Sequence, residues 1–517
     1  MKSNFVIFLS DEEAAPYPYE PDSIKVWRKM NLPMYNFFET KSASDGCLNF
    51  KNHRINNSGC RPSRADIQTG VDCNKHGVFC TDGLAIKEED VNFINPEKTK
   101  TLGMYLRENG YNTHYIGKQH FKNVSGEDDS NLESHGWSNW KSPEPHGPTS
   151  MKNASGYYRD QGYVEEAMTL IPKLQEPYCL FISLLNPHDI VFWTAHEMQY
   201  FPVGKLLAWF FGIPYIGPET DTTLPEKIDF PTDNENLSTK PQAHSQFIEI
   251  YKKIISKPFF YWFHSNKHRL RRFYYTLIKD VQNNFYKIFE TLQKLDSYNN
   301  TYFLYTADHG EMLGNHGDMY QKWYSMYEEA IHVPFYIYHP TQKFQPLPEN
   351  VLTCHLDIVP TILNLAGISI DSNNISGFKG KNLAPYILNH RDWNLLSHRR
   401  IHFHCYDDVT NGNDDYPIII KRTKLFYWLG LFRYRGVKGP RMIKAQIKST
   451  PSGIYKYAKY TDPDDTTNYE EEMYDLKNDP LEQNNLVLTP EVFKKIKNRL
   501  FKQRKRKGHL RFRGTIR

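Results

Sequence analysis

The sequence predicts an α/β fold, in which a large, mostly parallel β-sheet is sandwiched by helices and a smaller antiparallel α+β region follows. Short, continuous apolar runs such as 5–9 and 180–185 have the composition of parallel strands that are buried on both faces. Stretches with helical periodicity lie between such runs. After about position 393 the pattern changes to short, alternating strands separated by Gly, Pro and Asp turns, which indicates an antiparallel sheet.

The individual elements are predicted from the local spacing of apolar residues and from the residues that end helices and strands. Helices are predicted where apolar residues recur at helical spacing, and two of them end at a glycine, Gly110 or Gly367. The predicted strands of the large sheet are 4–10, 111–117, 179–185, 301–306 and 331–337. The predicted helices are 102–109, 273–295 and 356–366. Strands 401–404, 443–447 and 455–458, closed by 472–486, form the predicted antiparallel sheet.

These patterns divide the 517 residues into three parts. We expect an α/β domain over 1–392, an antiparallel-sheet subdomain over 393–490 and a basic tail over 491–517. Within the first part, 190–279 is interrupted by prolines and contains the aromatic run 206–215. Such an insertion is predicted to act as a lid that selects the substrate, and a hydrophobic contact in a homo-oligomer is the alternative.

The positive charge is concentrated at the C-terminus. The net charge is +5, but 12 Lys or Arg and no acid lie between Lys494 and Arg517, so the rest of the chain is net negative. This tail is either a solvated terminus or an arm that binds polyanions such as nucleic acid.

The sequence leaves the compartment open. No signal-peptide core and no apolar run of roughly 20 residues is present, so we expect no transmembrane segment and a cytoplasmic location by default. Seven dispersed cysteines favour a reducing compartment. Asn-x-Ser/Thr sequons such as the one at Asn123 point instead to secretion.

The most informative stretch is Ser58-Gly59-Cys60-Arg61-Pro62-Ser63-Arg64, which is followed by Thr69-Gly70 and His76. Pro62 suits a first helical position and Gly70 a helix end, so a short helix is predicted between them. Cys60 then lies just ahead of the positive end of the helix dipole, with Arg64 one turn behind it. This arrangement predicts an anion-binding site.

The same stretch resembles the signature of the type I sulfatases of the alkaline phosphatase superfamily. Its context is similar to the choline-sulfatase-like and phosphonate-monoester-hydrolase-like members. The resemblance implies that a formylglycine-generating enzyme oxidises Cys60 to a formylglycine aldehyde, and that this aldehyde is the nucleophile. It extends from Asn4 to Leu486 and is absent from the tail.

A divalent metal is implied by two acidic motifs at strand ends. Asp11-Glu12 ends the first strand, and Asp308-His309 ends the strand 301–306, where open α/β sheets place their ligands. By the resemblance, Asp11, Glu12, Cys60, Asp308 and His309 contact the metal. Carboxylates suit calcium and an imidazole favours ions such as manganese, so both remain open.

Further family-like blocks supply cations and proton donors for a dianionic group. They are Gly117-Lys118-Gln119-His120, Asn186-Pro187-His188-Asp189 and Lys322 before Tyr327-Glu328-Glu329. The resemblance implies a catalytic set of Cys60, Arg64, His76, Lys118, His120, His188 and Lys322. His76, or a neighbour, is expected to accept the proton when sulfate leaves.

These motifs predict a sulfuric ester hydrolase that cleaves a sulfate monoester to an alcohol and sulfate. By the family mechanism, one hydroxyl of the hydrated aldehyde attacks sulfur and the second then expels sulfate. Two alternatives remain. The same site could cleave phosphate or phosphonate esters, or the protein could be an inactive anion-binding homologue if Cys60 stays unmodified.

Overall fold

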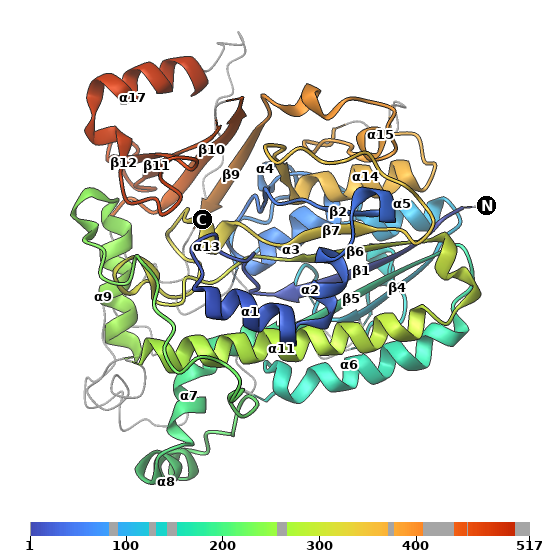
Figure 1. Ribbon diagram of the computed structural model, residues 1–517, viewed down its shortest axis with the longest axis horizontal. Helices are drawn as coiled ribbons and strands as arrows, with labels where there is room; N and C mark the ends of the chain where they lie inside the picture. Colours follow the sequence, from blue (N-terminus) through green and yellow to red (C-terminus); the bar gives the residue numbers. More distant parts are fainter. Residues whose placement is uncertain are drawn as a thin grey trace.

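A six-stranded sheet forms the centre of the protein in the computed structural model, which describes residues 2–81, 91–123, 131–141, 152–255, 266–370, 377–406, 439–451 and 453–501 (Figure 1). The strand order is β2-β7-β6-β1-β5-β4. The pairs β1/β5, β1/β6 and β4/β5 are parallel, whereas β7 pairs antiparallel with both β6 and β2. The predicted mostly parallel sheet is confirmed, with antiparallel pairing at one edge.

Five strands of this sheet lie close to the predicted runs, and the sixth, β2, was not predicted. They are β1 (Asn4–Asp11), β2 (Cys47–Asn49), β4 (Asn112–Gly117), β5 (Tyr178–Pro187), β6 (Thr301–Ala307) and β7 (Phe335–Tyr338). A separate two-stranded sheet pairs β3 (His53–Arg54) with β8 (Thr353–Cys354).

Helices cover both faces of the large sheet because alternate side chains of its central strand point to opposite faces. Phe5, Ile7 and Leu9 of β1 belong to a core with α3 (Cys60–Thr69), α5 (Leu102–Glu108) and α14 (Ile358–Leu365). Val6 and Phe8 belong to a second core with α2 (Pro33–Glu39), α6 (Gly156–Leu170) and α11 (Lys267–Leu292). The remaining helices are α1 (Asp22–Asn31), α4 (Cys73–His76), α7 (Trp193–Met198), α8 (Pro202–Phe211), α9 (Gln242–Ile255), α12 (Asn315–Asp318), α13 (Glu328–Ile331), α15 (Ala384–Ile387) and α17 (Pro490–Ile496).

The C-terminal sheet is antiparallel, as predicted, and has the order β12-β11-β10-β9. Its strands are β9 (Arg400–Tyr406), β10 (Met442–Thr450), β11 (Gly453–Thr461) and β12 (Tyr469–Asp475). Ile401, Phe403 and Ile443 pack with residues of α9 and α13, so this sheet shares a core with the rest of the molecule.

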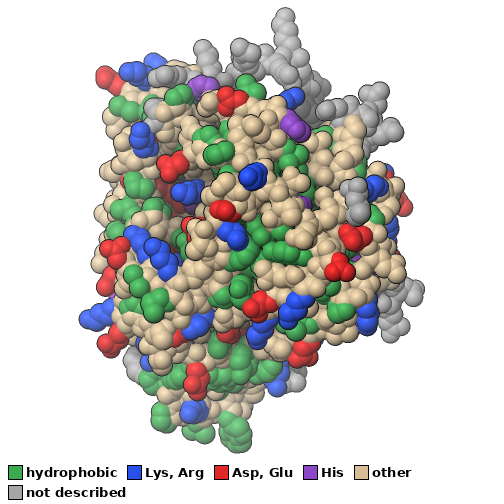
Figure 2. Space-filling model, turned by 45° about the vertical axis from the view of Figure 1, so that its right-hand side comes forward, with side chains coloured by type: hydrophobic (Ala, Val, Ile, Leu, Met, Phe, Trp, Pro, Cys, Tyr) green, Lys and Arg blue, Asp and Glu red, His purple; other side chains and the backbone are tan. Residues whose placement is uncertain are grey.

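The insertion expected over 190–279 does not form a single cover. Its first part, α7 and α8, projects at the lower end of Figure 1, and hydrophobic side chains gather at the same end in Figure 2. Its middle part, α9, packs against the C-terminal sheet, where His244 contacts the hydroxyl of Tyr460 at 3.2 Å. Its last part belongs to α11, which begins at Lys267 rather than near Phe273. The aromatic run 259–263 lies outside the described residues.

The basic tail also begins within the fold. α17 and the turn Lys497–Phe501 pack against the C-terminal sheet, and Lys497 forms an ion pair with Glu471 at 2.5 Å. The carbonyl oxygen of Leu500 accepts a hydrogen bond from Lys448 at 3.4 Å. The predicted boundary at 491 therefore cuts through a packed helix, and the part of the tail from 502 onward lies outside the described residues.

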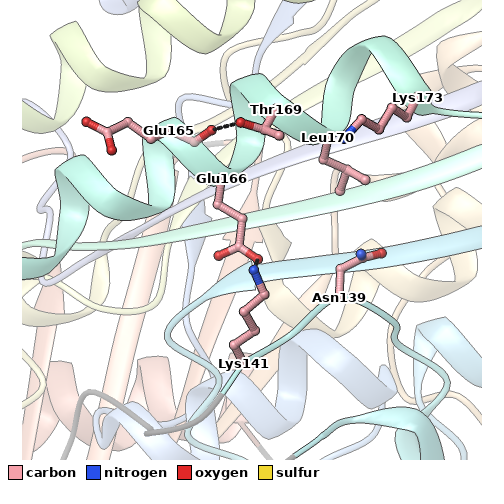
Figure 3. Close-up of a pocket in the computed structure, with 7 residues that line it drawn as sticks. All are labelled: Asn139, Lys141, Glu165, Glu166, Thr169, Leu170 and Lys173. Carbon is pink, nitrogen blue, oxygen red and sulfur yellow. Dashed lines mark hydrogen bonds and ion pairs between the residues drawn. The ribbon is translucent and has the colours of Figure 1, made fainter.

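No helix among the described residues has both the length and the apolar character needed to cross a membrane. A cavity of about 380 Å³ lies beside the sheet edge, between α6 and the segment that follows β4 (Figure 3). Lys141 and Glu166 form an ion pair across it at 3.2 Å. None of the predicted site residues lines this cavity.

Candidate active site

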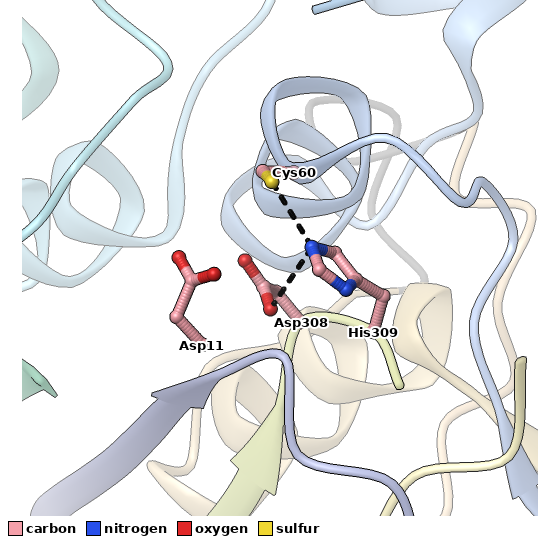
Figure 4. A group of neighbouring side chains, drawn as sticks. All are labelled: Asp11, Cys60, Asp308 and His309. Carbon is pink, nitrogen blue, oxygen red and sulfur yellow. Dashed lines mark hydrogen bonds and ion pairs between the residues drawn. The ribbon is translucent and has the colours of Figure 1, made fainter. Parts of the chain in front are cut away.

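Four side chains that could bind a metal meet at the edge of the large sheet where its parallel strands end (Figure 4). Each of Asp11, Cys60, Asp308 and His309 offers a ligand atom, and these atoms all lie within 4.8 Å of one another. All four residues are buried. We call this group the four-residue cluster.

The topology explains why residues so distant in sequence meet. β1 and β6 are neighbouring parallel strands, with Ser10 opposite Ala307, so the residues that follow both strands lie at the same edge. The first residue of α3 faces this edge and is Cys60 itself, because Gly59 is the N-cap. The predicted helix therefore starts two residues earlier than Pro62, and its expected end at Gly70 is confirmed by a left-handed φ of 66°.

Within the four-residue cluster, His309 is oriented by its own backbone. Its Nδ1–H donates to the carbonyl oxygen of Gly310 at 3.0 Å, which fixes the tautomer and leaves the lone pair of Nε2 available. Nε2 lies 3.0 Å from the Sγ of Cys60 and 3.6 Å from Oδ1 of Asp308. The imidazole is thus aimed at the centre of the cluster.

Arg64 holds the two aspartates in place. Its Nε donates to Oδ2 of Asp308 and its Nη2 to Oδ2 of Asp11, both at 2.8 Å. Its Nη1 donates to the hydroxyl of Ser183 and to the carbonyl oxygen of Lys118, again at 2.8 Å. A guanidinium suits this task because its donors have a fixed, planar arrangement.

Asp11 is ionised despite its burial. Burial raises the pKa of a carboxyl group, but Lys118, whose Nζ lies 2.6 Å from Oδ2 of Asp11, and Arg64 hold the pKa of Asp11 well below its usual range. Conversely, burial works against the charge of Lys118, but Asp11 raises the pKa of that ammonium group. Oδ1 of Asp11 has no hydrogen-bond partner among the described residues, so it is available to a cation.

Glu12 lies outside the four-residue cluster and contacts Lys322. Its backbone has a left-handed φ of 73°, and its N–H donates to Oδ1 of Asp308 at 3.0 Å. Its Oε1 accepts from Nζ of Lys322 at 3.1 Å, and burial raises the pKa of its carboxyl group to about 8. Glu12 is not in the four-residue cluster, but it forms a second group of possible ligands with Asp11 and His188.

Most of the other predicted catalytic residues lie near the cluster or next to a neighbour of Cys60. Lys118, His188 and Lys322 lie beside Asp11 or Glu12, as described above. Nε2 of His120 lies 3.2 Å from Nη2 of Arg61, the residue next to Cys60.

His76, by contrast, contacts Asp66 and Val78 and lies outside the four-residue cluster. Its Nε2 contacts Oδ1 of Asp66 at 3.0 Å, and its Nδ1 accepts the N–H of Val78 at 3.0 Å. Because both ring nitrogens are occupied in this way, the geometry does not favour the predicted role of His76 as a proton acceptor.

Two residues at this edge were given no role from the sequence. Oε1 of Glu311 accepts the N–H groups of Leu313 and Gln321, at 3.1 and 2.8 Å, and its charge acts on Glu12. Ser183 is the single hydroxyl within the apolar run 179–185, and it binds Arg64. A second acid in the motif after β6 and a lone polar residue in a buried strand were the signals that could have identified them.

Comparison with known proteins finds a matching family model and several relatives. A family model described as Sulfatase matches residues 3–368. The delta 4,5-hexuronate-2-O-sulfatase of Bacteroides thetaiotaomicron is 26% identical over 461 residues, which are 87% of this chain and 79% of that protein. Arylsulfatase K of Xenopus laevis is 24% identical over 420 residues, which are 76% of this chain and 70% of that protein.

Solved structures share the fold. A 2-O GAG sulfatase has a TM-score of 0.65 and 22% identity, and the match covers 96% of this chain and 89% of that one. The phosphonate monoester hydrolase of Agrobacterium radiobacter has a TM-score of 0.61 and 15% identity, with 96% and 93% of the two chains covered.

Proposed function

Because this chain belongs to the sulfatase family and hydrolyses sulfate esters, we propose that position 60 carries its nucleophile, as a formylglycine made from Cys60 beside one divalent cation. The observation that carries the proposal is the four-residue cluster, in which Sγ of Cys60 lies within 4.8 Å of ligand atoms of Asp11, Asp308 and His309. Burial raises the pKa of the Cys60 thiol to about 12, so an unmodified cysteine is a poor nucleophile at neutral pH.

The donor set fits a divalent cation. Asp11, Asp308 and His309 would hold it, because the free Oδ1 of Asp11 and the oriented Nε2 of His309 lie in the same cluster. A bound cation would neutralise charge on a sulfate oxygen and make a hydroxyl group at position 60 more acidic. Two carboxylates and one imidazole suit calcium or manganese.

The surrounding side chains provide the remaining chemistry. Arg64 holds the carboxylates of Asp11 and Asp308 in fixed positions, through its hydrogen bonds to both. Lys118 and Lys322 place positive charge beside position 60, where a sulfate group needs fixed cations. His188 lies next to Asp11 and is the proposed donor of a proton to the leaving alcohol.

A formylglycine at position 60 supplies a hydrated aldehyde, whose first hydroxyl attacks sulfur and whose second hydroxyl allows release of sulfate. Mass spectrometry of the tryptic peptide that contains position 60 tests this proposal, because formylglycine is about 18 Da lighter than cysteine by its composition. The protein should come from a host with a formylglycine-generating enzyme. A peptide that contains only unmodified cysteine, in protein that still hydrolyses aryl sulfate, would rule the assignment out.

The finer proposal concerns the alcohol. We infer a sugar sulfate with the ester at the 2-position of a hexuronate, because the relative at 26% identity carries that activity in its name. Sulfate release should be compared between an unsaturated hexuronate 2-O-sulfate and N-acetylglucosamine 6-O-sulfate, with an aryl phosphonate monoester as the control for the alternative chemistry. Faster turnover of the 6-O-sulfate would contradict the position, and faster turnover of the phosphonate would contradict the reaction class.

A further inference from the structure

The outer end of the insertion is α8, which approaches α7 closely at a glycine. A Cβ added to Gly204 of α8 would lie 2.1 Å from the carbonyl oxygen of Met198 in α7, so the two helices approach closely at this point. Ala208, one turn later, is buried. Gly204 and Ala208, at i and i+4, therefore both lie on the side of α8 that faces the protein.

The opposite side of α8 presents large apolar residues to solvent. Val203, Leu206 and Trp209 are 58%, 63% and 79% exposed, and their spacing of three residues places them in one stripe. A helix that only covers a core turns polar residues to solvent, so three exposed large apolar residues in one stripe need another explanation. α8 lies at the tip of the molecule, where hydrophobic side chains gather in the space-filling view (Figures 1 and 2).

The surroundings of this stripe favour a lipid surface. Between Met198 and Pro218 the sequence contains one charged residue, Lys205, and no acid. The segment contains the exposed Tyr200, and the exposed Tyr157 contacts the ring of its Tyr215. Tyrosine and tryptophan are enriched where proteins meet the headgroup region of a bilayer. Lys205 can keep its ammonium group in water beside such a surface.

A second copy of the chain fits the stripe less well. A stable dimer buries about 800 Å² per partner, from roughly 20 to 30 residues. α8 has ten residues, and its outward stripe consists of three described side chains on a projecting tip. Insertion of a convex tip into a bilayer needs no matching groove.

We propose that α8 is an interfacial anchor, which docks the enzyme on a lipid bilayer by inserting Val203, Leu206 and Trp209 among the headgroups. The anchor would keep the catalytic edge at a membrane surface that carries its substrates. The proposal is independent of the proposed chemistry, because the stripe contains no residue of the candidate active site.

Cosedimentation of the full chain with phosphatidylcholine vesicles, with and without 20% phosphatidylserine, tests the anchor. We expect the full chain to sediment with both compositions, and V203S/L206S/W209S to lower the partition coefficient by about tenfold or more. The matched control V26S/M30S replaces two exposed apolar residues of α1 and should leave binding unchanged. Turnover of a small soluble aryl sulfate should be the same for all three proteins.

A second measurement locates the inserted residue. Brominated lipids should quench tryptophan fluorescence of the unmodified protein, and W209F should remove that quenching while vesicle binding persists. Three results would each overturn the proposal: no sedimentation with either vesicle, undiminished sedimentation of the triple variant, or a solution dimer that the triple variant abolishes.

Discussion

At the scale of single residues, the site depends on an unusual backbone conformation at Glu12, next to the cluster residue Asp11. Glu12 follows Asp11 in a left-handed conformation, which non-glycine residues rarely adopt, and its N–H then reaches Asp308. The turn directs the Glu12 side chain to Lys322 and not to the four-residue cluster. The strand-end acids Asp11 and Asp308 were predictable from the sequence. This turn was not, because no feature of the local sequence predicts a left-handed conformation at Glu12.

The first prediction tests the nucleophile. Cys60→Ala should lower sulfate release by about a thousandfold or more, because it removes the proposed nucleophile. Folding and metal binding should be largely retained, since Asp11, Asp308 and His309 remain. Activity is measured as sulfate release, and folding by circular dichroism. The matched control Cys47→Ala removes a buried thiol outside the cluster, and activity of Cys60→Ala within about tenfold of the parent would reject the role.

The second prediction concerns the metal ligand His309. His309→Asn should shift the preference from manganese toward calcium, because a hard amide oxygen replaces a borderline nitrogen. The ratio of the dissociation constants of the two ions, from calorimetry, is the measurement. His114→Asn, on β4 and outside the cluster, serves as the control, and an unchanged ratio in His309→Asn would count against ligation.

At the scale of elements, sequence patterns predicted the existence of strands and helices better than their partners. Five strands of the large sheet and the Gly70 and Gly367 helix ends were predicted because the signals are local, whereas the short edge strand β2 was missed. The packing of α9 against the C-terminal sheet was not predicted, because its contact with Tyr460 joins segments more than 200 residues apart. The docking of α17 was missed for a similar reason, since Lys497 gives no sign in the sequence that Glu471 is its partner.

The third prediction separates the docked and undocked parts of the basic tail. A chain that ends at Phe501 should keep its melting temperature, because α17 and the Lys497–Glu471 ion pair are retained. A chain that ends at Thr489 should melt several degrees lower, because Phe493, Ile496 and Leu500 no longer cover Met473. Differential scanning fluorimetry gives both values, and equal melting temperatures would contradict the docking.

Both truncations should leave turnover of a small ester nearly unchanged and should weaken binding to a polyanion such as a sulfated glycan. The slope of log affinity against log salt should become shallower, because eight cationic residues lie beyond Phe501. A loss of small-ester turnover in the folded shorter chains would place the tail near the site.

At the scale of the whole molecule, buried charges join the C-terminal sheet to the α/β part. Lys456 of β11 forms ion pairs with Glu328, at 3.3 Å, and with Glu482. Glu328 also accepts from Arg54 of β3 at 2.6 Å. The change of pattern near position 393 was correctly predicted to start a different sheet, but these contacts show that the two parts form one packed unit.

The fourth prediction tests this junction. Lys456→Met should lower the free energy of unfolding by about 3 to 5 kcal/mol, because it removes the buried cation of Glu482 and one of the two cations of Glu328, which keeps only Arg54. Urea denaturation gives the value. Lys444→Met, at an exposed position of the neighbouring strand β10, should change the free energy by less than about 0.5 kcal/mol, and an equally small change for Lys456→Met would show that the pairs contribute little.

The central position of β1 has a consequence for synthesis. β1 pairs with β6, where Ile7 lies opposite Leu304, so during synthesis this edge of β1 stays open until about 300 further residues have been made. At roughly 5 to 20 residues per second, this takes about 15 to 60 s. Throughout that interval Cys60 lacks the covering that Asp308 and His309 provide in the finished fold. The pace of translation therefore sets how long this cysteine can be reached by another protein.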